Sequence, residues 1–227
     1  MPERTLAEEL AAFAVKAMAG AVPDDVVASV RQRVLDVLGL CVAALDLPTS
    51  RAAIEHVAEQ GGRPEAHAIG IAHQVPAAWA AFAIGLTAHS LDYDDTHLPS
   101  VLHPSAAVVP AALAAAELAG AGGAETVRAI AVGLETTVRL GMAGYDTELG
   151  NSVFFEHGQH ATSICGAMGG AVAAALLLGL GEEGVRNALG VAASMASGVI
   201  EGNRTGGTVK RLHCGWAAHS AVTAAQL

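Results

Sequence analysis

The chain has 227 residues, of which 52% are hydrophobic and 15% charged, and this balance excludes an intrinsically disordered protein. Its formal net charge is −10 and its basic residues are scattered, which argues against nucleic acid or an anionic membrane surface as a partner. Aromatic residues make up only 4%, whereas small apolar residues and glycine are abundant, so the composition favours closely packed helices over a β-sandwich or barrel.

Capping residues, prolines and glycines divide the chain into a series of predicted helices. We predict helices over residues 5–19, 23–47, 51–60, 76–90, 104–119, 125–144, 161–180, 182–197 and from 210 onward. The first begins at a capping box of Thr5 and Glu8, and Ser50 can cap the third. Pro110 predicts a kink in the fifth. Between the third and fourth helices, residues 61–75 predict a turn and a small strand.

Residues 161–181 form an uncharged segment that is long enough to span a membrane. Gly166 and Gly170 have the GxxxG spacing of paired membrane helices. Alanine and glycine are only weakly hydrophobic, however, and Glu182 and Glu183 follow directly without a basic flank. We therefore predict a helix buried in the centre of a helical protein, and no membrane-spanning segment.

Three polar segments between the apolar helices concentrate the residue types that carry chemistry. They read HSLDYDDTHLPSVLHPS (89–105), FFEHGQHATS (154–163) and EGNRTGGTVKRLHCG (201–215). Six of the ten histidines lie in these segments, and so does Lys210, one of only two lysines. Because functional groups of helical proteins usually lie in loops at helix ends, these segments are the candidate site.

Each candidate residue also has a purely structural interpretation. Lys210 begins a helix, where its ammonium group adds to the positive helix terminus that binds anions, but it could equally be a solvated surface lysine. His103 and His160 each precede a helix and could act only as caps. The Asp-Asp-Thr sequence at 94–96 could serve only to order its loop.

Taken together, the three segments resemble the characteristic blocks of the MmgE/PrpD family, which includes 2-methylcitrate dehydratase, cis-aconitate decarboxylase and iminodisuccinate epimerase. The blocks are LDYDDT (91–96) followed by HPS (103–105), GQHAT (158–162) running into a Gly/Ala-rich helix, and KRLHCGWAA (210–218). They occur in the family's order and span nearly the whole chain, which is far more specific than any single motif. The resemblance implies an all-α, multi-helix MmgE/PrpD N-terminal domain over residues 1–227.

In the family, the helical domain is followed by a smaller α/β lid domain. The last predicted helix of this chain ends without a cap signal, and the sequence matches only the first part of the family's helical domain. We therefore expect a truncated chain that lacks the lid and the C-terminal helices. The acidic N-terminal segment and the three widely spaced cysteines predict a cytoplasmic protein, and analogy with the family predicts a homodimer.

The resemblance implies that Asp92, Thr96, His103, His160 and Lys210 line the active site. Family members act on small di- or tricarboxylates, so the expected ligand is a small carboxylate, and neither a cofactor nor a metal ion is expected. The chemical difficulty is the movement of a proton on a carbon next to a carboxylate.

The expected roles follow from the chemistry of each side chain. We expect the two histidines to be the acid and the base, in an order that the sequence leaves open, and the lysine to bind a substrate carboxylate. The threonine would donate a hydrogen bond to the substrate, and the aspartate would orient a histidine. Dehydration, decarboxylation and epimerisation could all use such a site.

Three other interpretations stay open. An iron–sulfur dehydratase could use the three cysteines, although these are far apart in the sequence and Cys41 and Cys165 lie in apolar helical runs. The second interpretation is a non-catalytic helical fragment or assembly module. The third is a metal-dependent helical enzyme, which could use the carboxylates and imidazoles of the first segment. Its candidate ligands are Asp92, Asp94, Asp95, His97 and His103.

Overall fold

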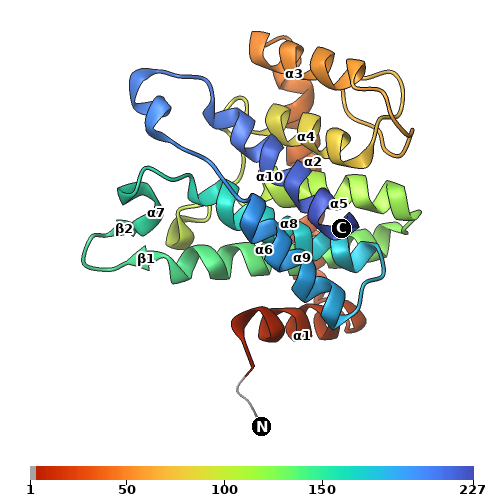
Figure 1. The fold of residues 1–227 in the computed structure, drawn as a ribbon, viewed down its shortest axis with the longest axis vertical. Helices are drawn as coiled ribbons and strands as arrows, with labels where there is room; N and C mark the ends of the chain where they lie inside the picture. Colours follow the sequence, from red (N-terminus) through yellow and green to blue (C-terminus); the bar gives the residue numbers. More distant parts are fainter. Residues whose placement is uncertain (1–3) are drawn as a thin grey trace.

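The computed structural model of the protein describes residues 4–227 and consists almost entirely of helices (Figure 1). The α-helices are α1 (Leu6–Ala19), α2 (Asp24–Ala44), α3 (Pro48–Glu59), α4 (Ala77–Ala88), α5 (Ser105–Ala119), α6 (Gly123–Ala143), α7 (Val153–Glu156), α8 (Ala161–Leu177), α9 (Glu182–Met195) and α10 (Lys210–Gln226). Two short 3-10 helices, η1 (Leu98–Ser100) and η2 (Glu201–Thr205), lie in the polar segments. Within residues 4–227, the one sheet is an antiparallel pair, β1 (Tyr145–Asp146) and β2 (Asn151–Ser152). The prediction of an all-α fold is confirmed.

Local signals set most helix boundaries close to where the sequence predicts them. At the start of α1, the backbone N–H of Glu8 donates to the Thr5 hydroxyl and the backbone N–H of Thr5 donates to the Glu8 carboxylate, which completes the predicted capping box. Pro110, where the sequence predicts a kink, lies inside α5. At the end of α5, Gly120 adopts a left-handed conformation with φ 66°, which lets the chain turn away from the helix axis.

Three local predictions differ from the structure. The third helix begins at Pro48, because a proline is favoured in the first helical turn, and Ser50 is therefore a buried helical residue whose hydroxyl donates to Ser90. The strand predicted after it is only an isolated bridge between Ala66 and Val75. Residues 145–160, which lie between two predicted helices and for which the sequence predicts no regular element, contain the short hairpin β1–β2 and the one-turn helix α7.

The predicted apolar helix, α8, runs through the middle of the molecule (Figure 1). It contacts α1, α5, α6, α9 and α10, and its side chains are buried on all sides. The prediction of a buried central helix is confirmed. Among residues 4–227, no single helix combines the length and apolarity needed to cross a membrane, although α2 and α3, bent by 100°, reach that length and composition as a pair.

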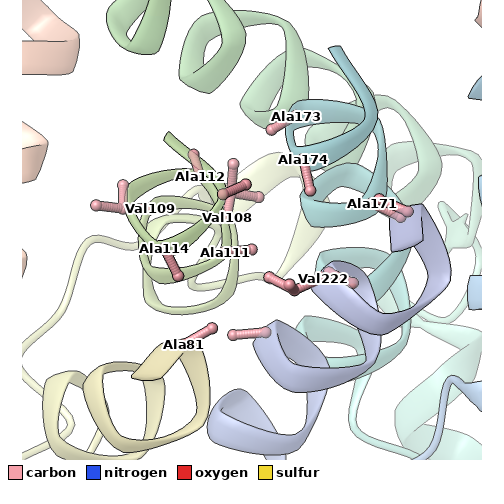
Figure 2. Close-up of a cluster of buried hydrophobic side chains, with 14 of the residues drawn as sticks. Ala81, Val108, Val109, Ala111, Ala112, Ala114, Ala171, Ala173, Ala174 and Val222 are labelled. Atoms are coloured by element: carbon pink, nitrogen blue, oxygen red, sulfur yellow. The ribbon is translucent and has the colours of Figure 1, made fainter. Parts of the chain in front are cut away.

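The core around α8 is built from small side chains rather than from large aromatic ones. In Figure 2, Val108, Ala111 and Ala112 of α5 lie opposite Ala171 and Ala174 of α8. Small residues let helix axes approach closely, so the contact area comes from many short side chains and from backbone atoms. This is the packing that the alanine- and glycine-rich composition predicts.

Glycines mark the points of closest helix contact. At Gly169 in α8, a Cβ would overlap the Thr137 hydroxyl and the Gly133 carbonyl of α6. Between α4 and α10, a Cβ on Gly85 would lie 2.8 Å from the Cys214 carbonyl oxygen. The close contact between these two antiparallel helices brings the end of α4 to the beginning of α10, where Lys210 lies.

We predict that Gly169→Ala lowers the free energy of unfolding by about 1–3 kcal/mol, because the added methyl group forces α6 and α8 apart. Gly190→Ala, at an exposed position in α9 where a Cβ meets open space, is the matched control. It should raise stability by up to about 1 kcal/mol through its better helix propensity. Urea unfolding of both variants checks this, and equal effects of the two substitutions would contradict the close α6–α8 contact.

Candidate active site

The three polar segments meet where the ends of four helices converge. His89 caps the C-terminal end of α4, and His103 lies just before the start of α5. His160 is the N-cap residue of α8, and Lys210 is the first residue of α10. Segments that are far apart in the sequence therefore place histidines and the lysine at one location, beside the first polar loop. His213, one helical turn after Lys210, joins them from α10.

Asp94 is the centre of this arrangement. Its buried carboxylate lies 2.8 and 2.9 Å from Nδ1 of His89, and its backbone carbonyl oxygen lies 3.3 Å from Nδ1 of His103. An ionised carboxylate and a carbonyl can only accept hydrogen bonds, so the Nδ1–H group of each histidine is the donor. In the neutral form of each ring, the Nε2 atom therefore carries the lone pair.

The two free Nε2 atoms face a second carboxylate, Asp92. Oδ1 of Asp92 lies 3.8 Å from Nε2 of His89 and 3.8 Å from Nε2 of His103. The hydrogen bond that Asp92 does form is with Lys210, whose Nζ donates to Oδ1 at 2.5 Å. The carboxylate that orients a histidine through a hydrogen bond is thus Asp94, whereas Asp92 holds the lysine.

The backbone conformation and the lowered pKa of Asp92 are both consistent with its contact with Lys210. Its φ angle is 58°, a left-handed conformation that is uncommon for residues other than glycine and that marks local strain. Partial burial by itself would raise the pKa of the Asp92 carboxyl group, but the hydrogen bond and the charge of Lys210 outweigh this effect and lower the pKa. Lys210 is itself mostly buried, with a side chain 16% exposed, so it is not an ordinary solvated lysine.

A second pair of histidines, His160 and His213, is buried and adjoins the first. His160 is 1% exposed, and its Nδ1 lies 3.2 Å from Nδ1 of His213, so one ring donates a hydrogen bond to the other. Burial, together with the charges of His89 and His213, lowers the pKa of His160 to about 2, and burial also lowers the pKa of His213. His160 is therefore neutral at physiological pH. The rings of His160 and His89 stack with centroids 5.7 Å apart, which connects the two histidine pairs.

The first polar loop is fastened to the helices by Asp95. Its carboxylate accepts hydrogen bonds from the backbone N–H and the hydroxyl of Ser105, and forms an ion pair with Arg33 of α2. Burial raises the pKa of Asp95 despite these contacts. The backbone N–H of His103 donates to the Thr162 hydroxyl at 3.1 Å, which ties the same loop to α8.

The structure thus brings four of the five predicted site residues into one connected set. His103 and Lys210 both lie beside Asp92, and His160 joins them through the stacked ring of His89. The fifth, Thr96, lies at the exposed edge, with its hydroxyl 3.4 Å from Nδ1 of His103. The His160 side chain makes no capping hydrogen bond within the described residues 4–227, which removes the cap interpretation for it. Whether these residues are catalytic stays a prediction.

The site residues that the family resemblance implies do not include His89, Asp94 and His213, and Asp94 is predicted only as a metal ligand in the alternative interpretation. The signal for His213 is its position three residues after Lys210, which places both on one helix face. His89 and Asp94 lie in the first polar segment, but their hydrogen bond depends on a loop conformation that the spacing does not reveal.

One group of side chains in the described part of the chain has the geometry of a metal site. Ligand atoms of His89, Asp92, Asp94 and His103 lie within 4.8 Å of one another. Of the other proposed ligands, Asp95 is bonded to Arg33 and Ser105, and Nδ1 of His97 lies 2.8 Å from the Ser100 hydroxyl. The three cysteines are buried, and burial raises the pKa of the Cys41 thiol to about 11 and that of Cys165 to about 12. None of them belongs to a group of three or more potential metal ligands among residues 4–227, which argues against an iron–sulfur site.

The helical fold and its histidine–lysine cluster define a helical domain with a polar site at its converging helix ends, and sequence comparison gives the family. The model for the MmgE/PrpD N-terminal domain matches residues 8–227, so the chain belongs to the MmgE/PrpD family. The chain is 30% identical to a cis-aconitate decarboxylase of Aspergillus terreus over 88% of its own length and 40% of the relative's. It is 35% identical to the Homo sapiens cis-aconitate decarboxylase over 68% of its own length and 31% of the relative's. The chain thus spans less than half the length of these relatives.

We predict that the buried, neutral state of His160 makes the protein less stable as the pH falls. An unfolded chain binds a proton on this ring below about pH 6.5, whereas the folded protein does not until the pH approaches about 2, so the free energy of unfolding decreases below pH 6.5. His160→Gln should reduce the slope of the free energy of unfolding against pH by about 1.4 kcal/mol per pH unit between about pH 4 and 6.

Urea unfolding at a series of pH values measures this slope. His157→Gln, an exposed histidine in the same polar segment, is the control and should leave the slope unchanged. Nitrogen-15 NMR gives a second, independent measurement, and an imidazolium signal from His160 at pH 5 in the folded protein would contradict the prediction.

Proposed function

We propose that this chain carries part of the active site of a cofactor-independent lyase that acts on a small di- or tricarboxylate. Support comes from the family membership and from the cluster of Lys210, Asp92, His103 and His89 at the converging helix ends. Decarboxylation is the favoured reaction, because the matched relatives are named cis-aconitate decarboxylases. The observation that carries the proposal is the contact of a lysine ammonium with a carboxylate beside a proton-carrying imidazole.

In this proposal, Lys210 binds a carboxylate of the substrate. Its ammonium group already contacts the carboxylate oxygen of Asp92 at 2.5 Å, so a second carboxylate can approach the same charge. Asp92 keeps the flexible lysine side chain in place, which reduces the conformational entropy lost on substrate binding. The hydroxyl of Thr96, at the exposed edge beside His103, donates a hydrogen bond to the substrate.

His103 is the proposed proton donor. When the bond between carbon and the departing carboxylate breaks, carbon dioxide leaves and the electron pair stays on carbon. The carbon then takes a proton from Nε2 of an imidazolium, and His103 recovers a proton from water. His103 suits this role because its side chain is 21% exposed, and because the carboxylates of Asp92 and Asp94 lie 3.8 Å from its ring nitrogens and can stabilise a positive charge.

His160 takes a different part in this scheme. Its lowered pKa of about 2 keeps it neutral, so it cannot deliver a proton as an imidazolium at physiological pH. A neutral imidazole still donates one hydrogen bond and accepts another, which suits a group that positions His89 or the substrate. Dehydration and epimerisation remain alternatives, because both also move a proton on a carbon next to a carboxylate.

We predict that His103→Gln lowers kcat/KM for the carboxylate substrate by about 10²–10⁴-fold, the usual effect of removing a positioned acid. Lys210→Met should lower it by about 10²–10³-fold, because it removes the charge that stabilises the substrate carboxylate. The assay follows carbon dioxide release from cis-aconitate, and proton exchange in D₂O for a panel of other small diacids. The protein assayed is the complete polypeptide that the gene encodes.

Matched controls separate chemistry from folding. His157→Gln and Lys16→Met replace an exposed histidine and the other lysine, and both should retain full activity. Circular dichroism establishes that each variant is folded. Undiminished turnover in folded His103→Gln and Lys210→Met would reject the site assignment, and an inactive wild type on every acid would favour the non-catalytic assembly module.

A further inference from the structure

A buried nitrogen without a partner lies in the centre of the histidine–carboxylate cluster. Nε2 of His89 makes no hydrogen bond with any residue from 4 to 227, although the side chain is fully buried. It faces Oδ1 of Asp92 at 3.8 Å, and Nε2 of His103 lies at the same distance from the same oxygen. Because buried polar atoms are nearly always paired in proteins, these three atoms mark a position where another ligand fits.

Asp94 prepares both histidines for such a ligand. Its carboxylate accepts a hydrogen bond from Nδ1 of His89, and its backbone carbonyl accepts one from Nδ1 of His103. Both rings are thereby held with the Nε2 lone pair available. A carboxylate hydrogen-bonded to the far side of a histidine is the arrangement that commonly orients histidine ligands of metal ions.

The charges of the cluster also favour a cation. Asp92 and Asp94 bring two negative charges, and the ammonium group of Lys210 on Asp92 compensates one of them. The neighbouring carboxylate, Asp95, is already paired with Arg33. A divalent cation in the cluster would balance both carboxylates and would leave Lys210 free to turn towards solvent.

We propose that Nε2 of His89, Nε2 of His103 and a carboxylate oxygen of Asp92 bind a transition-metal ion of the Zn²⁺ type, in competition with the ammonium group of Lys210. Two imidazoles and one carboxylate are a preferred ligand set of Zn²⁺, with a fourth position open to water, whereas Mg²⁺ and Ca²⁺ prefer oxygen ligands. Tetrahedral ligands at about 2.0–2.2 Å from zinc lie about 3.3 Å apart. The 3.8 Å separations must therefore close by about 0.5 Å, which the half-exposed side chain of Asp92 permits.

Metal binding at this position inhibits the proposed lyase activity. The ion occupies the Nε2 lone pair that His103 uses to carry a proton, and it separates Lys210 from the aspartate that positions it. Metal binding itself does not depend on the proposed function, whereas its inhibitory effect does.

The test is a titration of the protein with Co²⁺, whose visible absorption reports tetrahedral coordination. We expect saturation at one ion per chain, displacement by Zn²⁺ and no displacement by a hundredfold excess of Mg²⁺. His89→Gln should abolish the absorption band, and Lys210→Met should tighten binding at least tenfold, because the competing ammonium group is removed. His157→Gln and Lys16→Met should bind as the wild type does.

Several results would overturn the inference: no saturable Co²⁺ band, an unchanged band in folded His89→Gln, or weaker binding in Lys210→Met. A parallel assay adds Zn²⁺ to the active enzyme, where loss of activity that a chelator restores supports inhibition, and a rise in activity overturns it. If the protein has no lyase activity but binds Co²⁺ as expected, the proposed function fails while the metal site stands.

Discussion

The carboxylate of Asp94 is a buried negative charge, and such a charge is stable in a protein interior only when hydrogen bonds or opposite charges compensate it. The ring of His89 supplies that compensation from the end of α4. In return, Asp94 determines which nitrogen of His89 and which nitrogen of His103 carries the proton. The proton transfer and the metal binding that we propose both depend on this one residue, because it decides which ring nitrogens carry the lone pairs.

Asp94 can act in this way only because the helix ends around it converge. That convergence rests on small residues in the core. Gly85 brings the backbone of α4 against α10, and Gly169 does the same for α8 and α6. Larger side chains at these positions would move the helix ends apart by ångströms, which is the scale on which hydrogen bonds are lost. The close packing of small side chains in the core (Figure 2) thus also brings the polar cluster together.

Burial separates the histidines into groups with different chemical capacities. His160 is fully buried beside other histidines, and its low pKa keeps it neutral. His103 lies closer to the surface, where water can reach its ring and where the Asp92 and Asp94 carboxylates lie nearby. The surroundings therefore give the same side chain different access to water and to neighbouring charges.

Much of this protein follows from the sequence alone. Composition and helical periodicity determined the all-α class and the buried central helix, because both depend on the average character of many residues. Three ordered motifs determined the family, and they drew attention to Asp92, His103, His160 and Lys210. Only the tertiary structure decided the partners of these residues. Asp92 holds the lysine and Asp94 orients the histidine, in a loop where Asp92 adopts a left-handed conformation. Hydrogen-bond pairing responds to differences of an ångström that no spacing in the sequence encodes.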